Sequence, residues 1–212
     1  MLNGRIVRHL GTRAIWGLDN IKVNGQEIPK PFERIYLMLN KPFGYISTLN
    51  DPAGRPIVTE LLKDVNERVY PVGRLDFDTI GLLLFTNDGE WSYRLTHPRY
   101  HVPRTYKVTV EGNMDEKIMN SLRKGVQLED GFSGPSKITL LQKDRGRTVI
   151  RMTITSGRSR LVRRMVEAVG FRVVQLLRTG VGCVVLGNLK VGEYRYLEAD
   201  EVQTMKKMVG LG

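Results

Sequence analysis

The segment from Arg68 to Arg94 constrains the fold of this chain more strongly than any other segment. A short apolar run from Val69 to Val72 leads to a glycine, and a second apolar run covers Ile80 to Phe85. Asn87 or Asp88 then stands where a side chain can cap the first turn of a helix. The order of these features predicts a strand, a polar corner, a second strand and a helix.

The polar corner places Arg74 and Asp76 one residue apart. In an extended segment residues i and i+2 share a face, so both side chains can look into the same space while Leu75 turns away. Taken alone, such a pair is more often an exposed ion pair on a surface turn. The flanking sequence therefore has to decide between a functional site and a surface pair.

The chain has 212 residues, enough to bury a core as one domain or two small lobes. Its net charge of +11 at pH 7 favours a polyanionic partner, most often nucleic acid. An anionic membrane is the alternative, but no segment combines a wide apolar helix face with a basic one. Cations kept only for solubility are the third interpretation.

Several classes of function are disfavoured. Cys183 is the only cysteine, which excludes an intrachain disulfide, and we expect a reducing, cytoplasmic location. His97 and His101 straddle Pro98 without an acid cluster beside them, which argues against a metal site. No phosphate-binding loop, signal-peptide pattern or apolar run near the ~20 residues of a membrane helix is present.

The segment from Ser159 to Val169 is the second informative element, because its apolar residues recur at helical spacing along one face. The opposite face is expected to carry Arg160, Arg163, Arg164 and Glu167. Six arginines lie between Arg158 and Arg178 against one acid, so the positive charge is clustered. A solvated helix face would look the same in this segment alone.

Periodicity and turn residues predict the remaining elements. Asn24-Gly25 indicates a hairpin, the prolines from Pro29 to Pro31 indicate a stiff linker, and a helix is expected from about Asp200. The other expected elements are strands at Ile35–Leu39, Tyr106–Val110, Ile138–Leu141, Val149–Ile154 and Val173–Leu177, a short helix or strand at Val58–Leu62, a helix at Asn113–Lys124 and a hairpin at Gly187–Leu197.

The central segment closely resembles the pseudouridine synthases that modify ribosomal RNA. The shared motifs are Gly73 to Asp76, Thr79, Gly81 to Leu84, Thr86 to Gly89 and Leu95 to Pro98, with Asn40 to Tyr45 and Arg163-Arg164-Met165 as further matches. The loop Asp51 to Pro56 and the run Gly187 to Arg195 are more similar to large-subunit members than to small-subunit members.

The resemblance implies an α+β fold with a largely antiparallel mixed sheet in two lobes, flanking helices and a central RNA-binding cleft. Residues 1–32 are similar to the second half of a small N-terminal RNA-binding domain, plus a linker, and residues 33–212 would form the catalytic domain. The implied partner is ribosomal RNA or a pre-ribosomal particle. The protein is expected to bind it as a monomer, and no membrane is expected as a partner.

The implied reaction cleaves the N-glycosidic bond of uridine, turns the uracil and joins its C5 to C1′. It involves no net oxidation or group transfer, so no cofactor is expected. By resemblance Asp76 is the catalytic carboxylate, which either attacks C1′ or removes a ribose proton, and Arg163 faces it. Tyr106 would lie against the extruded uracil, although a strand residue half in the core is the alternative. Arg74 would occupy the place that the base leaves.

Further candidate RNA-binding residues are Lys41, Arg104, Arg158, Arg160 and Arg164, with Lys41 expected to shape the pocket rather than react. Two positions depart from the family pattern: Arg104 replaces a lysine, and Leu161 replaces Gln or Glu. An inert RNA-binding or ribosome-assembly factor, a small-subunit synthase and an RNA glycosidase remain as alternatives.

Overall fold

A computed structural model describes residues 1–9, 11–15, 18–28, 33–144 and 146–211. The chain divides into two compact units, Met1–Arg34 and Ile35–Gly212. The linker predicted at Pro29 to Pro31 lies outside the described residues.

The first unit contains a short antiparallel hairpin of β1 (Lys22–Val23) and β2 (Gln26–Glu27). Asn24 and Gly25 both have positive φ, 52° and 81°, as a tight two-residue hairpin turn requires. The hairpin predicted from Asn24-Gly25 is therefore confirmed.

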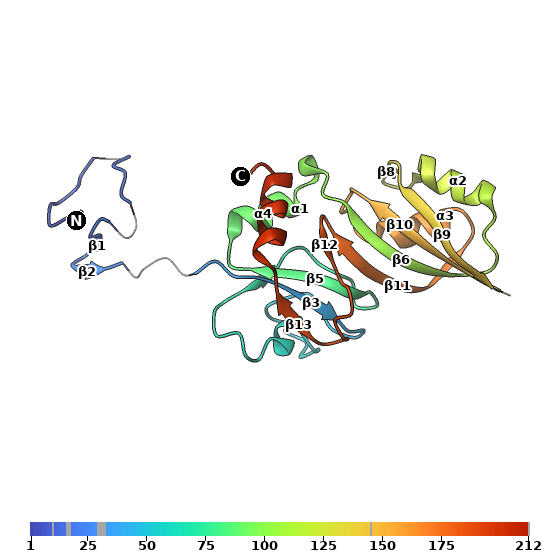
Figure 1. Cartoon of the computed structure of the whole chain (residues 1–212), viewed down its shortest axis with the longest axis horizontal. Coiled ribbons are helices and arrows are strands. Elements are labelled where there is room, and N and C mark those ends of the chain that lie inside the picture. Colours follow the sequence, from blue (N-terminus) through green and yellow to red (C-terminus); the bar gives the residue numbers. More distant parts are fainter. Residues whose placement is uncertain (10, 16–17, 29–32, 145, 212) are drawn as a thin grey trace. The chain divides into compact units, whose positions relative to one another are not determined.

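The second unit is built on a nine-stranded sheet, which continues through both halves of the unit (Figure 1). Among the described residues, every strand pair of this sheet is antiparallel except β11 with β5, so the predicted largely antiparallel α+β fold is confirmed. The main order is β13 (Tyr194–Tyr196), β3 (Tyr36–Lys41), β5 (Ile80–Thr86), β11 (Arg172–Val181), β6 (Arg104–Glu111), β10 (Arg147–Ile154) and β9 (Lys137–Asp144), with β4 (Tyr70–Pro71) beside β5 and β12 (Val184–Val185) beside β11.

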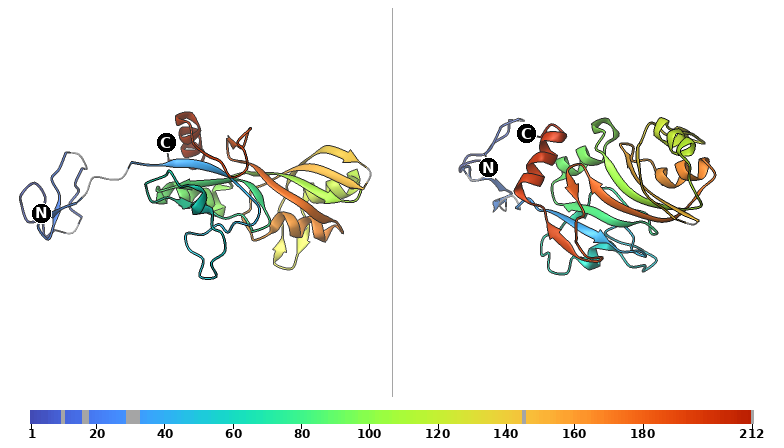
Figure 2. Two further views of the ribbon diagram at one scale, coloured as in Figure 1. Left: turned by 90° about the horizontal axis from the view of Figure 1, so that it is seen from below. Right: turned by 45° about the vertical axis from the view of Figure 1, so that its right-hand side comes forward.

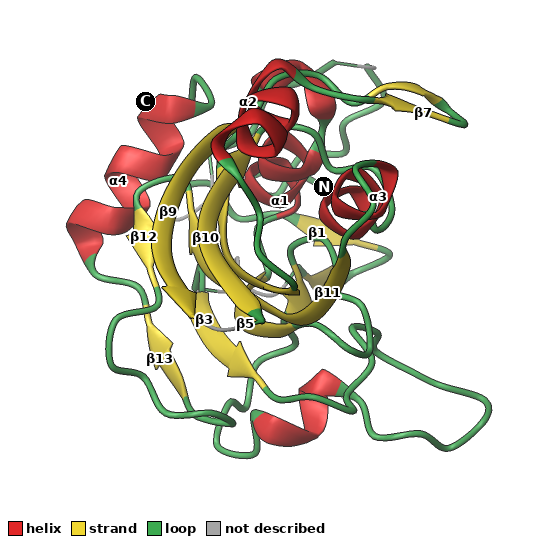
Figure 3. Cartoon of the chain, turned by 90° about the vertical axis from the view of Figure 1, so that its right-hand side faces the viewer, coloured by secondary structure: helices red, strands yellow, loops and turns green. Residues whose placement is uncertain are grey.

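Helices cover both faces of the sheet, at different ends. The helices α1 (Gly89–Thr96) and α4 (Ala199–Met208) lie with the β3–β5 half, and α2 (Glu116–Lys124) and α3 (Leu161–Ala168) lie with the β6–β10 half (Figure 1). Figure 3 shows α4 on one side of the sheet and α3 on the other. Two short 3-10 helices, Val58–Leu61 and Pro98–Tyr100, stand in the connections. None of the helices in the described part of the chain is long and apolar enough to cross a membrane.

The apolar run of β5 is continuous because the strand is buried on both faces. Leu83 and Phe85 join the core beneath α2 and α3, whereas Leu82 and Leu84 join a second core that includes Trp91 of α1. By contrast, β6 alternates between buried and exposed residues, as predicted. The central segment is thus packed from both sides directly after its polar corner.

The two halves of the sheet meet where β5 runs parallel to β11, with Gly81 opposite Arg178. Gly81 has φ +105°, and a Cβ there would lie 2.3 Å from the backbone oxygen of Arg178. Only glycine allows this close approach. This contact fixes the distance between the polar corner after β4 and the strand that carries Arg178.

The helix caps agree with the sequence in part. Asp88 caps α1 by accepting a hydrogen bond from the Trp91 amide, and α4 places acids in its first turn and lysines in its last.

The expected polar face of α3 is wrong in one residue, because Arg163 is buried. The hairpin predicted over Gly187–Leu197 is also wrong: its only strand is β13, which pairs with β3 instead of a neighbouring strand.

Candidate active site

A cavity of about 280 Å³ opens beside the polar corner of the central segment. Its walls come from the segment after β4, the start of β6, the loop before α3, and β11. The lining includes Arg74, Asp76, Arg104, Tyr106, Arg158, Arg160 and Arg178. The fold thus brings together residues that are more than a hundred positions apart in the sequence.

Lys41 holds the backbone of the polar corner through hydrogen bonds of its side chain. Its side chain is completely buried, and its Nζ donates to the backbone oxygens of Pro42, Asp76 and Thr79 at 3.0, 3.1 and 2.9 Å. Burial lowers the pKa of Lys41 to about 8, against the opposing effect of the nearby Asp76 and Asp78 carboxylates. Lys41 therefore holds the loop, and its buried amine is not placed to contact RNA.

The rest of the corner's backbone is held in the same way. The Leu75 oxygen accepts from the Ser47 hydroxyl at 2.9 Å, and the Phe77 oxygen accepts from the Gly44 amide at 3.0 Å. The Asp78 oxygen accepts from Arg163 Nη2 at 3.0 Å. Together with the bonds of Lys41, every backbone oxygen from Leu75 to Thr79 has a donor. Such a backbone is preorganised, so the Asp76 side chain projects from a fixed support.

Two arginines of the α3 region approach the carboxylates of the corner. Arg160 Nη1 lies 3.9 Å from Asp76 Oδ2 and 3.5 Å from Asp78 Oδ1. Arg163 Nη2 lies 3.2 Å from Asp78 Oδ2, so the expectation that Arg163 pairs with Asp76 needs correction. The physical reason is that Arg163 is buried beneath the loop, whereas the Asp76 side chain is 39% exposed beside the cavity.

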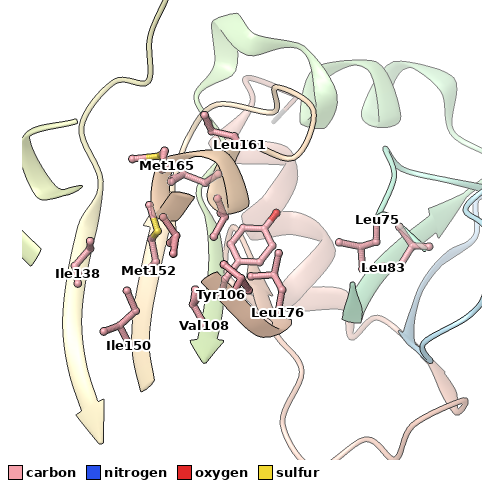
Figure 4. Packing of buried hydrophobic residues seen from close by; sticks show 14 of the residues in the cluster. Leu75, Leu83, Tyr106, Val108, Ile138, Ile150, Met152, Leu161, Met165 and Leu176 are labelled. Carbon is pink, nitrogen blue, oxygen red and sulfur yellow. The ribbon is translucent and has the colours of Figure 1, made fainter. Parts of the chain in front are cut away.

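Tyr106 and Arg104 lie on the β6 wall of the cavity. Tyr106 is buried within the core, and Figure 4 shows its ring beside Leu176, which also lines the cavity. Tyr106 is thus a residue of the core and also a residue of the cavity wall. Arg104 donates to the backbone oxygens of Leu95 and Thr155, and burial lowers its pKa.

Arg74 is exposed at the cavity. No hydrogen bond or ion pair joins its side chain to another residue in the described ranges. Its guanidinium is consequently available to an incoming group, unlike the guanidinium of Arg163.

Arg158 and Arg164 share one partner, Asp130, in the turn between β7 (Gln127–Leu128) and β8 (Gly131–Phe132). Asp130 Oδ1 lies 2.8 Å from Arg164 Nη1 and 3.3 Å from Arg158 Nη1, and the Arg164 hydrogen bond lowers the pKa of Asp130. This hairpin lies next to α3 (Figure 2). Arg158 lines the cavity, whereas Arg164 points to the hairpin and is not part of the lining.

The sequence analysis counted Arg178 in the arginine cluster but did not single it out as a residue of the site. It is buried in β11, its Nε donates to the Leu82 oxygen at 2.7 Å, and it lines the cavity. The available signal was an arginine inside an apolar strand, because a buried charge is retained only with partners.

A neutral ring that enters the cavity would meet the carboxylate of Asp76. The arginines of the lining could bind negatively charged groups attached to that ring. Among the described residues, no group of three or more His, Cys, Asp or Glu side chains could hold a metal ion.

The family model of RNA pseudouridylate synthases matches residues 35–168. The chain is 40% identical to the ribosomal large subunit pseudouridine synthase B of Bacillus subtilis (strain 168), over all of this chain and 86% of that protein. It is 36% identical to the ribosomal small subunit pseudouridine synthase A of Escherichia coli (strain K12), over 96% of this chain and 87% of that protein. A crystal structure of a pseudouridylate synthase superposes with a TM-score of 0.74 at 34% identity, over 97% of this chain and 87% of that chain. This chain belongs to the RNA pseudouridylate synthase family.

Proposed function

We propose that this protein converts uridine to pseudouridine at specific sites of large-subunit ribosomal RNA, with Asp76 as the catalytic carboxylate. One observation carries the proposal: the partly exposed carboxylate of Asp76 projects from a loop whose backbone oxygens from Leu75 to Thr79 all accept hydrogen bonds, beside a cavity lined by Tyr106 and several arginines. The 40% identity to a relative named for the large subunit supports the choice of substrate.

The reaction is an isomerisation, so atoms and electrons balance without a co-reactant. Asp76 either attacks C1′ or removes a ribose proton, and the N-glycosidic bond breaks. The uracil turns and its C5 bonds to C1′, which releases Asp76 from C1′ or returns the ribose proton. C5 then loses its proton and N1 gains one, so Asp76 is regenerated. Both routes need an ionised carboxylate. Arg160 Nη1 lies 3.9 Å from Asp76 Oδ2 and places a positive charge beside this carboxylate.

Tyr106 provides a ring for the uracil to stack on, and its hydroxyl is the candidate group to assist loss of the C5 proton. Arg163 acts indirectly, since it binds Asp78 and the loop backbone beside Asp76. In this proposal Arg163 is a positioning residue.

Target uridines are stacked or paired, so the base has to leave the helix. Arg74 is exposed at the cavity and would fill the place that the base leaves. Arg160, Arg104 and Arg158 line the cavity and would bind the surrounding phosphates. Arg164 would reach RNA only after releasing Asp130.

The unit Met1–Arg34 is proposed to be part of a small RNA-binding module, in keeping with its turn-rich sequence and its hairpin. Residues from Ile35 onward would carry the chemistry. The proposed partner is a pre-ribosomal particle or free ribosomal RNA in the cytoplasm, bound by a monomer.

The test is a reaction of the purified protein with separate large-subunit and small-subunit ribosomal RNA transcripts, followed by mapping of pseudouridine. New pseudouridine at discrete large-subunit positions is expected. Modification of the small-subunit transcript alone would reassign the substrate, in line with the Escherichia coli relative. Release of free uracil would indicate a glycosidase, and absence of both products would indicate an inert binding factor.

A further inference from the structure

Two phenylalanines stand exposed next to the candidate catalytic carboxylate. Phe77 directly follows Asp76 and is 48% exposed, and Phe43, in the loop after β3, is 64% exposed. Their ring centroids are 5.5 Å apart with an interplanar angle of 63°, so they form an edge-to-face pair. Large apolar rings in such a position leave apolar surface in water beside the site, which calls for an explanation.

The backbone beneath both rings is held in place. The Gly44 amide donates to the Phe77 oxygen at 3.0 Å, which joins the residue after Phe43 to Phe77 itself. Gly44 has φ +85°, a conformation that side chains rarely adopt, and the Phe77 ring passes 3.9 Å from where its Cβ would stand. Phe77 is therefore presented on the same loop as Asp76, and Phe43 on the loop that is hydrogen-bonded to it through Gly44.

Carboxylates and guanidinium groups both lie in the segment that carries Phe77 and next to it. Arg160 reaches both carboxylates that flank Phe77, Asp76 at 3.9 Å and Asp78 at 3.5 Å, and Arg74 is exposed two residues before Asp76. Exposed aromatic rings interleaved with guanidinium groups are the pattern that binds unstacked bases of an RNA strand, the rings taking the base faces and the cations the phosphates.

The rings are placed for a neighbour of the target base rather than for the target itself. The cavity lining includes Asp76 and Tyr106 but neither Phe43 nor Phe77. Phe77 is next to Asp76 in the chain, and its exposed ring lies outside the cavity that would hold the target base.

We infer that Phe43 and Phe77 form a stacking platform for a nucleobase that flanks the target uridine. The inference rests on the proposed function for its substrate. Stacking on the platform keeps the strand open around the extruded base and favours targets with an unpaired neighbour. Because a base–aromatic stack contributes about 1–3 kcal/mol by substitution, loss of a ring is expected to weaken RNA binding roughly tenfold.

The variants Phe43→Leu and Phe77→Leu keep apolar volume and remove the ring. Tyr196→Leu is the matched control, since Tyr196 is 50% exposed and forms an edge-to-face pair with Tyr194, but lies on β13 and outside the cavity lining. The probe is a short fluorescein-labelled single-stranded RNA with one uridine flanked by purines. Companion probes carry an abasic ribose in place of either purine, and Kd is measured for every combination of protein and probe.

The platform predicts coupling between ring and flanking base. On the normal probe both Phe variants bind about tenfold more weakly than wild type, while the Tyr196 variant does not. On the probe lacking the stacked purine, wild type and Phe variants bind alike. Equal losses on normal and abasic probes would overturn the inference, because the rings would then support the loop and not a base.

Thermal unfolding of each variant tests for a folding defect. Because the rings are exposed, the unfolding midpoint is expected to stay at the wild-type value. The binding measurement is independent of turnover. Coupling without any pseudouridine formation would retain the platform and reject the proposed function. Pseudouridine formation without coupling would retain the function and reject the platform.

Discussion

Arg163 Nη2 contacts Asp78 at two atoms: it lies 3.2 Å from the carboxylate oxygen Oδ2 and donates to the backbone oxygen at 3.0 Å. The neighbouring Asp76 is approached instead by Arg160, which is half exposed. The arginine that the family motif points to thus anchors the loop, and the arginine just before the helix is the one near the candidate catalytic group.

Replacing Arg163 with Met is expected to lower stability and turnover together. The substitution leaves the Asp78 oxygen without its donor and removes a charge-assisted contact, a loss of about 1–3 kcal/mol. Urea unfolding and single-turnover kinetics measure the two effects. Arg160→Met is the matched variant, expected to reduce turnover with a smaller loss of stability because Arg160 is exposed. The reverse order of stabilities would contradict this division of roles.

Lys41 predicts a specific dependence of stability on pH. Its folded-state pKa of about 8 lies below the ordinary value of 10.5, so between these pH values the unfolded chain binds more protons than the folded chain. The free energy of unfolding of wild type, relative to Lys41→Met, should therefore rise as the pH increases from about 8 toward 10.5. The full rise is on the order of 3 kcal/mol.

Urea unfolding of both proteins from pH 7 to pH 10 measures this difference. The subtraction removes the contribution of the other titrating groups. A difference that stays flat or falls with increasing pH would show that Lys41 is not held with a lowered pKa.

Arg74→Ala is expected to affect structured RNA more than flexible RNA. The exposed guanidinium has no partner among the described residues, so its removal should leave the fold and the chemistry intact. What is lost is support for the helix after the target base has left it. Turnover should fall strongly on a hairpin substrate and weakly on a single-stranded one, and equal losses on both would argue against base displacement.

RNA binding is expected to weaken steeply with salt, because the arginines at the cavity release counterions from the phosphates. A plot of log Kd against log salt gives the number of phosphate contacts. Arg160→Gln should reduce the slope by about 1 if Arg160 binds one phosphate. An affinity that does not respond to salt would contradict an electrostatic RNA groove.

Local patterns predicted much of the fold. The apolar run of β5, the cap at Asp88 and the turn at Asn24-Gly25 depend on neighbouring residues, and all three were found where the sequence indicated. The hairpin over Gly187–Leu197 failed because Tyr194 pairs with Leu39, a partner far away in the chain that no turn signal reveals.

The site, like the fold, could be predicted where it depends on neighbouring residues and not where it depends on distant contacts. Asp76 and Arg74 stand out in one segment, and both lie at the cavity. The burial of Lys41, the contact of Arg163 with Asp78 and the shared partner of Arg158 and Arg164 all depend on tertiary packing across the β5–β11 junction and beside α3. Charge patterns in the sequence do not determine such pairings.

Pseudouridine formation by Asp76→Asn tests the central claim most directly. The change keeps the size of the side chain and removes its charge, while the loop remains held through the Asp76 backbone oxygen. On large-subunit ribosomal RNA modified by wild type, the variant is expected to form no pseudouridine and to bind RNA with nearly unchanged Kd. Turnover comparable to wild type in a protein with the same RNA affinity would contradict the assignment of Asp76.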